Sequence, residues 1–265
     1  LWTQSGNRRA EVTGPAQVLV TYLEFLLLFV VAPAAVLTSI VAYNQHHLGS
    51  RVWVALLGVS PIALAYTARW DQYLIAQNVW WYGEDRVRGA WLGVPWEEYG
   101  FMTLQPLLTG ALLLTLLSGR STLERSSASD LSAYIRGFPW AGLLFVTGFG
   151  AGILALRSGP EWTYLGLILV WAFPVIGALT AAAWPGLRTF AREAWITWIV
   201  STLYLGVADH FAISQGIWTI SSEQTTGWTL AGLPFEEALF FAATNALVVV
   251  GVMLFWTPGL PVGDH

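Results

Sequence analysis

The sequence contains no cysteine and no lysine, and it carries little charge for its length of 265 residues. Without cysteine there are no disulfides, thiolate nucleophiles or cysteine-ligated metals. Without lysine a Schiff base cannot form, so a retinal-binding photoreceptor is excluded. Charged residues make up 11%, whereas about 25% is usual for a soluble domain. A sequence pI near 5.5 also argues against nucleic acid as a partner.

Apolar residues dominate the sequence, at 55%, and the mean hydropathy is +0.58. They are gathered into seven spans, each near the ~20 residues that a helix needs to cross a bilayer. The spans cover residues 18–42, 52–80, 95–118, 138–156, 162–184, 194–218 and 235–257. This pattern predicts an all-α integral membrane protein with about seven transmembrane helices, and we expect a multi-pass protein of the cell membrane. Sixteen tryptophans indicate interfacial belts and an aromatic-lined cavity.

An internal repeat links the second span to the sixth. Four residues recur at a constant offset of 138, as Asp71, Ile75, Gln77 and Trp80 and as Asp209, Ile213, Gln215 and Trp218. Farther upstream, Tyr22-Leu23 loosely matches Tyr164-Leu165. Spans one to three therefore correspond to spans five to seven, and span four connects them. Three spans and a connector return the chain to its starting side, which predicts two parallel three-helix repeats.

The repeat gives the expected organisation of the chain. We expect a polar N-terminal tail (1–17), repeat 1 (18–118), a linker with a connecting helix (119–160), repeat 2 (161–258) and a C-terminal tail (259–265).

The motif Pro-x-Glu-Glu occurs twice, as Pro95-Trp96-Glu97-Glu98 and as Pro234-Phe235-Glu236-Glu237. Proline and acidic residues are favourable in the first turn of any helix, which is enough to explain one copy. Two copies at matched positions favour a functional role, because acidic groups at membrane depth are costly and usually functional. We expect the four glutamates to supply an acid and a base. The first glutamate of each pair, Glu97 or Glu236, is expected to matter most.

Other polar and aromatic residues are expected to support these glutamates. Asp71 and Asp209 orient them or simply end helices at the interface, and Glu24 lines the cavity or makes a structural hydrogen bond. Gln77 and Gln215 are expected to form hydrogen bonds between helices. Trp80 and Trp218 belong to the interfacial belt or to the cavity wall. No spacing typical of metal ligands is present, so no metal is expected.

The duplicated Pro-x-Glu-Glu motif and the Asp/Gln/Trp segment, over Tyr22 to Trp256, resemble the heterodimer-type lycopene cyclases in their fused, archaeal-like form. That family also occurs as two small membrane subunits and as a domain of bifunctional fungal enzymes. The resemblance implies cofactor-independent conversion of lycopene end groups to β-rings through a carbocation.

The resemblance also implies how such a reaction is housed. Trp80, Trp96, Trp218 and Phe235 would form the cavity and stabilise the cation. The partners would be a lipophilic linear carotenoid and the lipid bilayer, and an oligomer or an association with other carotenoid enzymes is compatible with this. The alternative is a proton-coupled transporter that uses the buried carboxylates.

Overall fold

The structure, a computed structural model, describes residues 20–49, 51–120 and 131–257. The predicted tails 1–17 and 259–265 lie outside these residues, as does part of the predicted linker. The helices of the first half are α1 (Tyr22–Leu26), the π-helical turn η1 (Leu27–Val31), α2 (Ala32–Tyr43), α3 (Gln45–Leu48), α4 (Arg51–Ala76) and α5 (Trp96–Leu117). Those that follow are α7 (Leu131–Ser158), η3 (Pro160–Trp162), α8 (Thr163–Thr189), α9 (Ala191–Ser214) and α10 (Phe235–Trp256).

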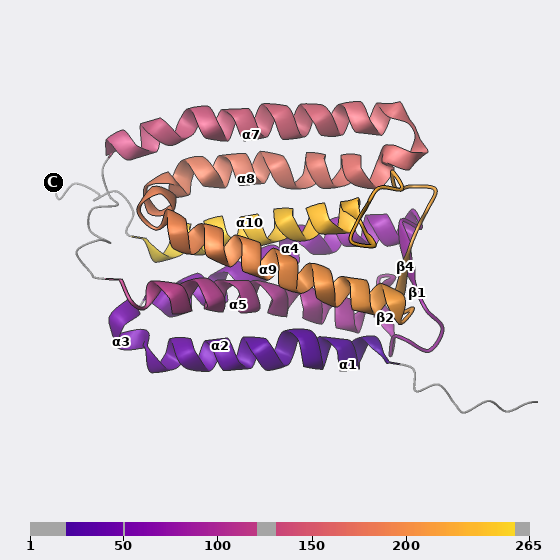
Figure 1. Cartoon of the computed structure of the whole chain (residues 1–265), viewed down its shortest axis with the longest axis horizontal. Coiled ribbons are helices and arrows are strands. Elements are labelled where there is room, and N and C mark those ends of the chain that lie inside the picture. The colour runs from indigo at the N-terminus through magenta and orange to yellow at the C-terminus, as the bar shows by residue number, and fades with distance from the viewer. Residues whose placement is uncertain (1–19, 50, 121–130, 258–265) are drawn as a thin grey trace, which may run out of the picture.

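Within the described ranges, seven helical segments are long and apolar enough to cross a membrane. They lie side by side along the long axis of the molecule (Figure 1). The prediction of an all-α, multi-span membrane protein is therefore confirmed, whereas the arrangement as two parallel repeats stays a prediction. Helix α7 lies at one edge of the bundle, where it packs mainly on α8 (Figure 1).

Two predicted spans extend past the ends of their helices. The spans 52–80 and 194–218 were expected to be helical throughout, but α4 ends at Ala76 and α9 at Ser214. In both places a residue with positive φ follows, Asn78 or Gly216. The next amide donates back to a carbonyl five residues earlier, over 3.0 Å in each case. This Schellman arrangement ends a helix and turns the chain into a strand.

Six short strands, which the sequence did not predict, cap one end of the bundle (Figure 1). They are β1 (Trp80–Tyr82), β2 (Ala90–Trp91), β3 (Val94–Pro95), β4 (Trp218–Ile220), β5 (Thr229–Leu230) and β6 (Leu233–Pro234). Strands β2 and β3 form a hairpin, as do β5 and β6, and each hairpin leads directly into the helix that carries a glutamate pair. The two-residue turns, 92–93 and 231–232, have positive φ at both positions and end on glycine, as a type I′ hairpin requires.

Strand β1 pairs with β4 in antiparallel fashion and so joins the two halves of the chain. The register places Trp81 opposite Thr219, which is its own counterpart at the repeat offset of 138. Two side chains reinforce the connection. Arg86 Nη2 donates to the Gln215 carbonyl over 2.5 Å, and Gln224 Nε2 donates to the Gln77 carbonyl over 2.9 Å. The strand end is thus held together by bonds between the halves.

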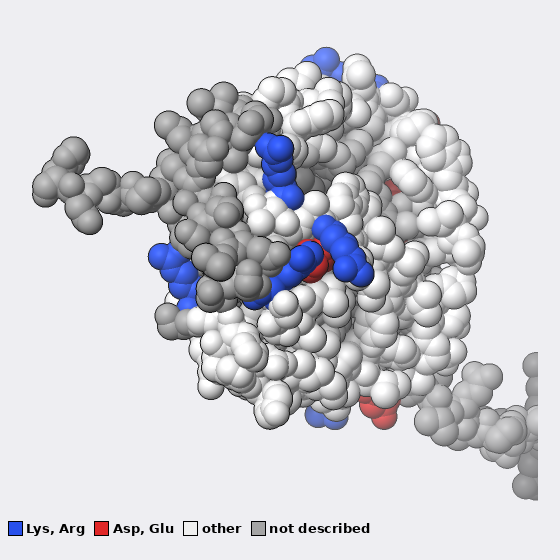
Figure 2. Space-filling model, turned by 60° about the vertical axis from the view of Figure 1, so that its left-hand side comes forward, with Lys and Arg blue, Asp and Glu red and all other residues white. Residues whose placement is uncertain are grey.

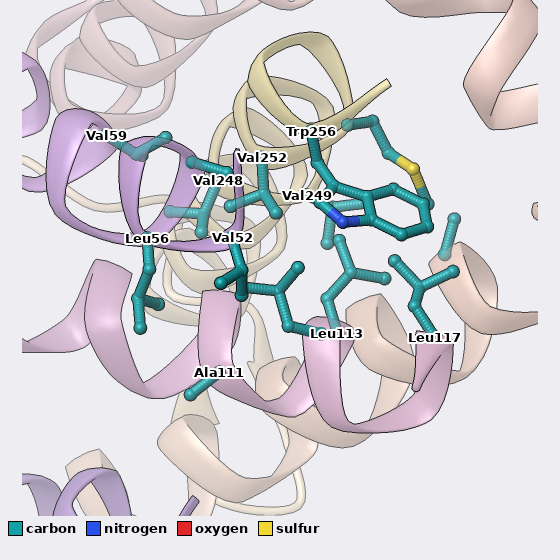
Figure 3. Packing of buried hydrophobic residues seen from close by; sticks show 14 of the residues in the cluster. Val52, Leu56, Val59, Ala111, Leu113, Leu117, Val248, Val249, Val252 and Trp256 are labelled. Carbon is teal, nitrogen blue, oxygen red and sulfur yellow. The ribbon is translucent and has the colours of Figure 1, made fainter. Parts of the chain in front are cut away.

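The opposite end of the bundle is closely packed and apolar. Helices α4, α5 and α10 meet there through residues such as Leu56, Leu113 and Val252 (Figure 3). At this same end Arg120 Nη2 pairs with Glu193 Oε1 over 2.6 Å. Figure 2 brings this end forward and shows basic side chains gathered on it, while the flank at the right carries almost no charge. An uncharged flank between polar ends suits a protein surrounded by lipid.

Candidate active site

A narrow chamber lies beneath the strands, between the helices of both halves. Four acidic side chains line it, Asp71, Glu98, Asp209 and Glu237. The rest of its wall is aromatic or aliphatic and consists of Tyr22, Phe25, Trp80, Tyr82, Phe101, Tyr164, Leu205, Trp218, Ile220, Phe240 and Phe241. The chamber is small, with a cavity volume of only about 50 Å³. Both Pro-x-Glu-Glu motifs therefore contribute to one shared site.

Glu98 is the third residue of α5, and two phenols bind it. Its Oε2 accepts a hydrogen bond of 2.7 Å from Tyr22 and one of 2.8 Å from Tyr82. Trp80 Nε1 in turn donates to the Tyr82 hydroxyl over 3.1 Å. Burial, and then the neighbouring Glu98 carboxylate, raise the pKa of Tyr82 well above its usual value. Tyr82 therefore keeps its proton at neutral pH and stays a donor to Glu98.

Glu237 occupies the same place in α10, but its surroundings differ. The Tyr164 phenol interacts with it, as Tyr22 does with Glu98. The counterpart of Tyr82 at the repeat offset is Ile220, which has no hydroxyl to donate. Among the described residues, Glu237 Oε1 is buried with no hydrogen-bond partner. The chamber thus contains one carboxyl group with two phenol donors and another with a free oxygen.

Asp71 and Asp209 lie in the chamber rather than at the interface. Both are almost fully buried, and each has an Oδ2 atom without a partner in the described part of the chain. Asp209 Oδ1 accepts a hydrogen bond of 2.9 Å from Trp218 Nε1. Asp71 interacts electrostatically with Glu98, and Asp209 with Glu237. Charging four buried acidic groups in one chamber would be costly, which favours a protonated state for some of them.

Glu97 and Glu236 are buried but do not line the chamber. Glu97 Oε1 accepts a hydrogen bond of 3.0 Å from the Arg88 amide. Glu236 Oε1 accepts one of 2.8 Å from the Thr226 amide and one of 2.7 Å from its hydroxyl. Each of these glutamates fastens the loop before its hairpin. The geometry therefore favours the second glutamate of each pair for chemistry, contrary to our expectation from the sequence.

Two aromatic residues expected in the cavity wall lie outside it. Trp96 is 57% exposed and stacks on Trp91, with ring centroids 6.4 Å apart. Phe235 packs against Trp228 at 6.1 Å. Both are the first residue of a helix, and neither lines the chamber. Their assignment as cavity walls is withdrawn.

Three polar residues predicted to support the site have structural roles. Glu24 is exposed and forms a capping box with Thr21, whose amide donates to Glu24 Oε2 over 2.8 Å. Gln77 and Gln215 follow the last residues of α4 and α9, and their backbone carbonyls accept bonds from Gln224 and Arg86. These contacts replace the expected side-chain bonds between helices.

The tyrosines are the site residues that sequence reasoning missed. The loose match of Tyr22 with Tyr164 was a signal for two of them. Tyr82 left no such signal, because its counterpart is Ile220. The sequence was compatible with Trp80 and Trp218 in either the interfacial belt or the cavity wall, and in the structure both line the chamber.

Comparisons with known proteins agree with this geometry. The family described as Lycopene cyclase matches residues 19–116 and 161–256, the two segments that build the chamber. A lycopene beta-cyclase of Halobacterium salinarum is 38% identical over 240 residues, which are 89% of this chain and 95% of that protein. A bifunctional lycopene cyclase/phytoene synthase of Podospora anserina is 34% identical over 84% of this chain and 38% of its own length. No solved structure matches. The family match includes both acid-bearing segments and the similarity to these relatives covers most of the chain, and the chain therefore belongs to the lycopene cyclase family.

Proposed function

We propose that this protein is a lycopene β-cyclase whose acid and base are Glu237 and Glu98. The single observation that carries the assignment of residues is that these two carboxyl groups, one from each half, line one narrow aromatic chamber. Relatives named lycopene beta-cyclase, similar along nearly the whole chain, support the reaction. The transporter alternative receives no support from the same comparisons.

The reaction moves protons and forms one carbon–carbon bond. A carboxylic acid protonates the terminal double bond of the linear end group, which leaves a tertiary carbocation. An internal double bond attacks this cation and closes the ring. A carboxylate then removes a proton from a ring carbon, and the electron pair of the broken carbon–hydrogen bond forms the new double bond. One proton is added and one removed, so the product is an isomer of the substrate and no electrons are exchanged.

The hydrogen bonds distinguish the two glutamates. Glu98 accepts from two phenols, an arrangement suited to a carboxylate that will receive a proton. The buried Oε1 of Glu237 lacks a partner, and a neutral carboxylic acid costs far less to bury there than a charged one. We therefore assign Glu237 as the acid and Glu98 as the base. Because both lie in one chamber, a proton received by Glu98 can return to Glu237 between turnovers.

The walls of the chamber suit a cationic intermediate. Trp80, Trp218 and the ring of Tyr164 face the same space, and each aromatic face stabilises a desolvated cation by up to ~2 kcal/mol. The narrowness of the chamber limits water, which would otherwise capture the cation. Apolar helices on all sides would receive a lipophilic substrate from the bilayer, which favours a location in the cell membrane.

Expression in cells that accumulate lycopene tests the proposal. We expect the pigment to be converted to carotenoids with one or two β-rings, separated by chromatography of the extract. A variant with both Glu98→Gln and Glu237→Gln, expressed to the same level in the membrane, is the control and should leave lycopene unchanged. Unchanged lycopene with the wild-type chain present in the membrane would refute the activity.

The first glutamates of the motifs provide a matched comparison. We expect Glu97→Gln and Glu236→Gln to keep cyclising, with rates lowered by no more than about tenfold, because these side chains fasten loops and do not touch the chamber. Their melting temperatures should fall, since each loses a charge-assisted bond to a backbone amide. Rates in membranes and thermal unfolding in detergent measure the two effects. A loss as large as that of Glu98→Gln or Glu237→Gln would restore them as candidates for the chemistry.

A further inference from the structure

A second cavity adjoins the acidic chamber and is almost entirely apolar. It runs between α4, α5, α8 and α10, and we call it the groove. The groove has a cavity volume of about 350 Å³, several times that of the chamber. Asp71, Glu98, Phe101 and Phe240 line both cavities, so the groove opens onto the first half's acidic pair.

The groove is long and flat-walled. On α10 its lining extends from Phe240 to Phe255, a rise of about 22 Å at 1.5 Å per residue. One wall is a stack of parallel rings, in which Trp171 lies 5.4 Å from Tyr66 at 15° and 6.3 Å from Phe240 at 21°. The far end borders the packed core at Val59 and Val248 (Figure 3). A long, planar, apolar molecule fits such a space.

In the other half of the chain, a larger side chain stands at the position that matches one residue of the groove. Met102 lines the groove. Its counterpart is Phe241, at the offset of 139 residues that relates Pro95 to Pro234. Phe241 is 5% exposed and packs in a cluster with Ala34, Leu108 and Leu205. Acidic residues of both halves line the chamber, whereas Asp71 and Glu98 of the first half are the acidic residues that line the groove.

We propose that the groove binds the polyene arm of the carotenoid while one end group occupies the chamber. This inference rests on the proposed function and assigns the substrate's long axis to the space between α4, α5, α8 and α10. Because this groove meets the chamber at the first half's acidic pair, it holds one arm, and the enzyme processes one end of the carotenoid at a time. A molecule with two linear ends must leave and re-enter reversed before its second ring forms.

A pair of substitutions on α4 tests the groove. Ala63 lines it, whereas Ala65, two residues along, is exposed on the outer surface and lines neither cavity. We expect Ala63→Phe to lower cyclisation of lycopene at least tenfold, because the ring occupies the path of the arm. The matched variant Ala65→Phe should cyclise lycopene at nearly the wild-type rate.

The decisive readout is a second substrate, a shortened polyene with one linear end group whose arm does not reach Ala63. Ala63→Phe should still cyclise this substrate within about threefold of wild type, which also shows that the variant folds. Equal losses on both substrates, or no loss on lycopene, would overturn the assignment. If Ala63→Phe does not accumulate in membranes, Gly251→Leu, farther along the groove, replaces it. The test is again the loss of activity on lycopene compared with the loss on the shortened substrate. A wild-type chain inactive on both substrates would instead refute the proposed function.

Discussion

Glu237→Gln is expected to abolish ring formation, with a loss of about 10²- to 10⁴-fold, and to leave the linear carotenoid chemically unchanged. Glutamine has nearly the same shape and can still accept the contact from Tyr164, but it has no proton to transfer. Because protonation comes first, no cation forms and no altered product appears. Product formation in membranes supplied with lycopene, followed by chromatography, measures the effect.

The matched control for this variant is Glu236→Gln, one residue earlier on the same helix. It makes the same substitution in the same motif, but Glu236 lies outside the chamber. A Glu237→Gln variant that retained more than about a tenth of wild-type activity would exclude Glu237 as the acid.

Glu98→Gln is expected to lower β-ring formation by about 10²- to 10³-fold, with a different pattern of products. The acid at Glu237 remains, so the end group is still protonated and the ring still closes. Without a base beside it, the cyclic cation loses a proton from another carbon or is captured by water. We therefore expect ring isomers or hydroxylated rings, resolved by chromatography and mass spectrometry, at the expense of the β-ring.

The contrast between the two variants assigns the roles. Tyr82→Phe, which removes one of the two phenol donors to Glu98, should shift products in the same direction but more weakly. If Glu237→Gln gave the altered rings and Glu98→Gln gave unchanged lycopene, the acid and the base would be exchanged. Identical, complete losses would mean that both carboxyl groups are needed before the first proton moves.

The sequence predicted the number of helices and the motifs that converge, because hydropathy and a constant offset are properties of the chain itself. It did not predict which glutamate faces the chamber. Adjacent helical residues point about 100° apart, so only one of Glu97 and Glu98 can face it. The rotation of α5 is set by the hairpin before it, whose strands are only two residues long and carry no periodic signal.

The differences between the two halves of the site could not be predicted from the sequence either. The second phenol on Glu98 comes from a strand after α4, and Phe241, the counterpart of Met102, packs against α2 and α9. Both are tertiary effects of single residues. Matching positions identify the residues that the two halves share. The proposed roles of Glu98 and Glu237 depend instead on residues that differ between the halves.

The pairing of β1 with β4 has a consequence for the origin of the chain. Trp81 lies opposite its own counterpart, Thr219, which is the pairing that two copies of one half-length protein would make across a twofold axis. In such an ancestor the two carboxyl groups would have had identical neighbours. In this chain Tyr82 and Ile220 stand at matched positions and differ, so the two carboxyl groups have different neighbours and can serve as a proton donor and a proton acceptor.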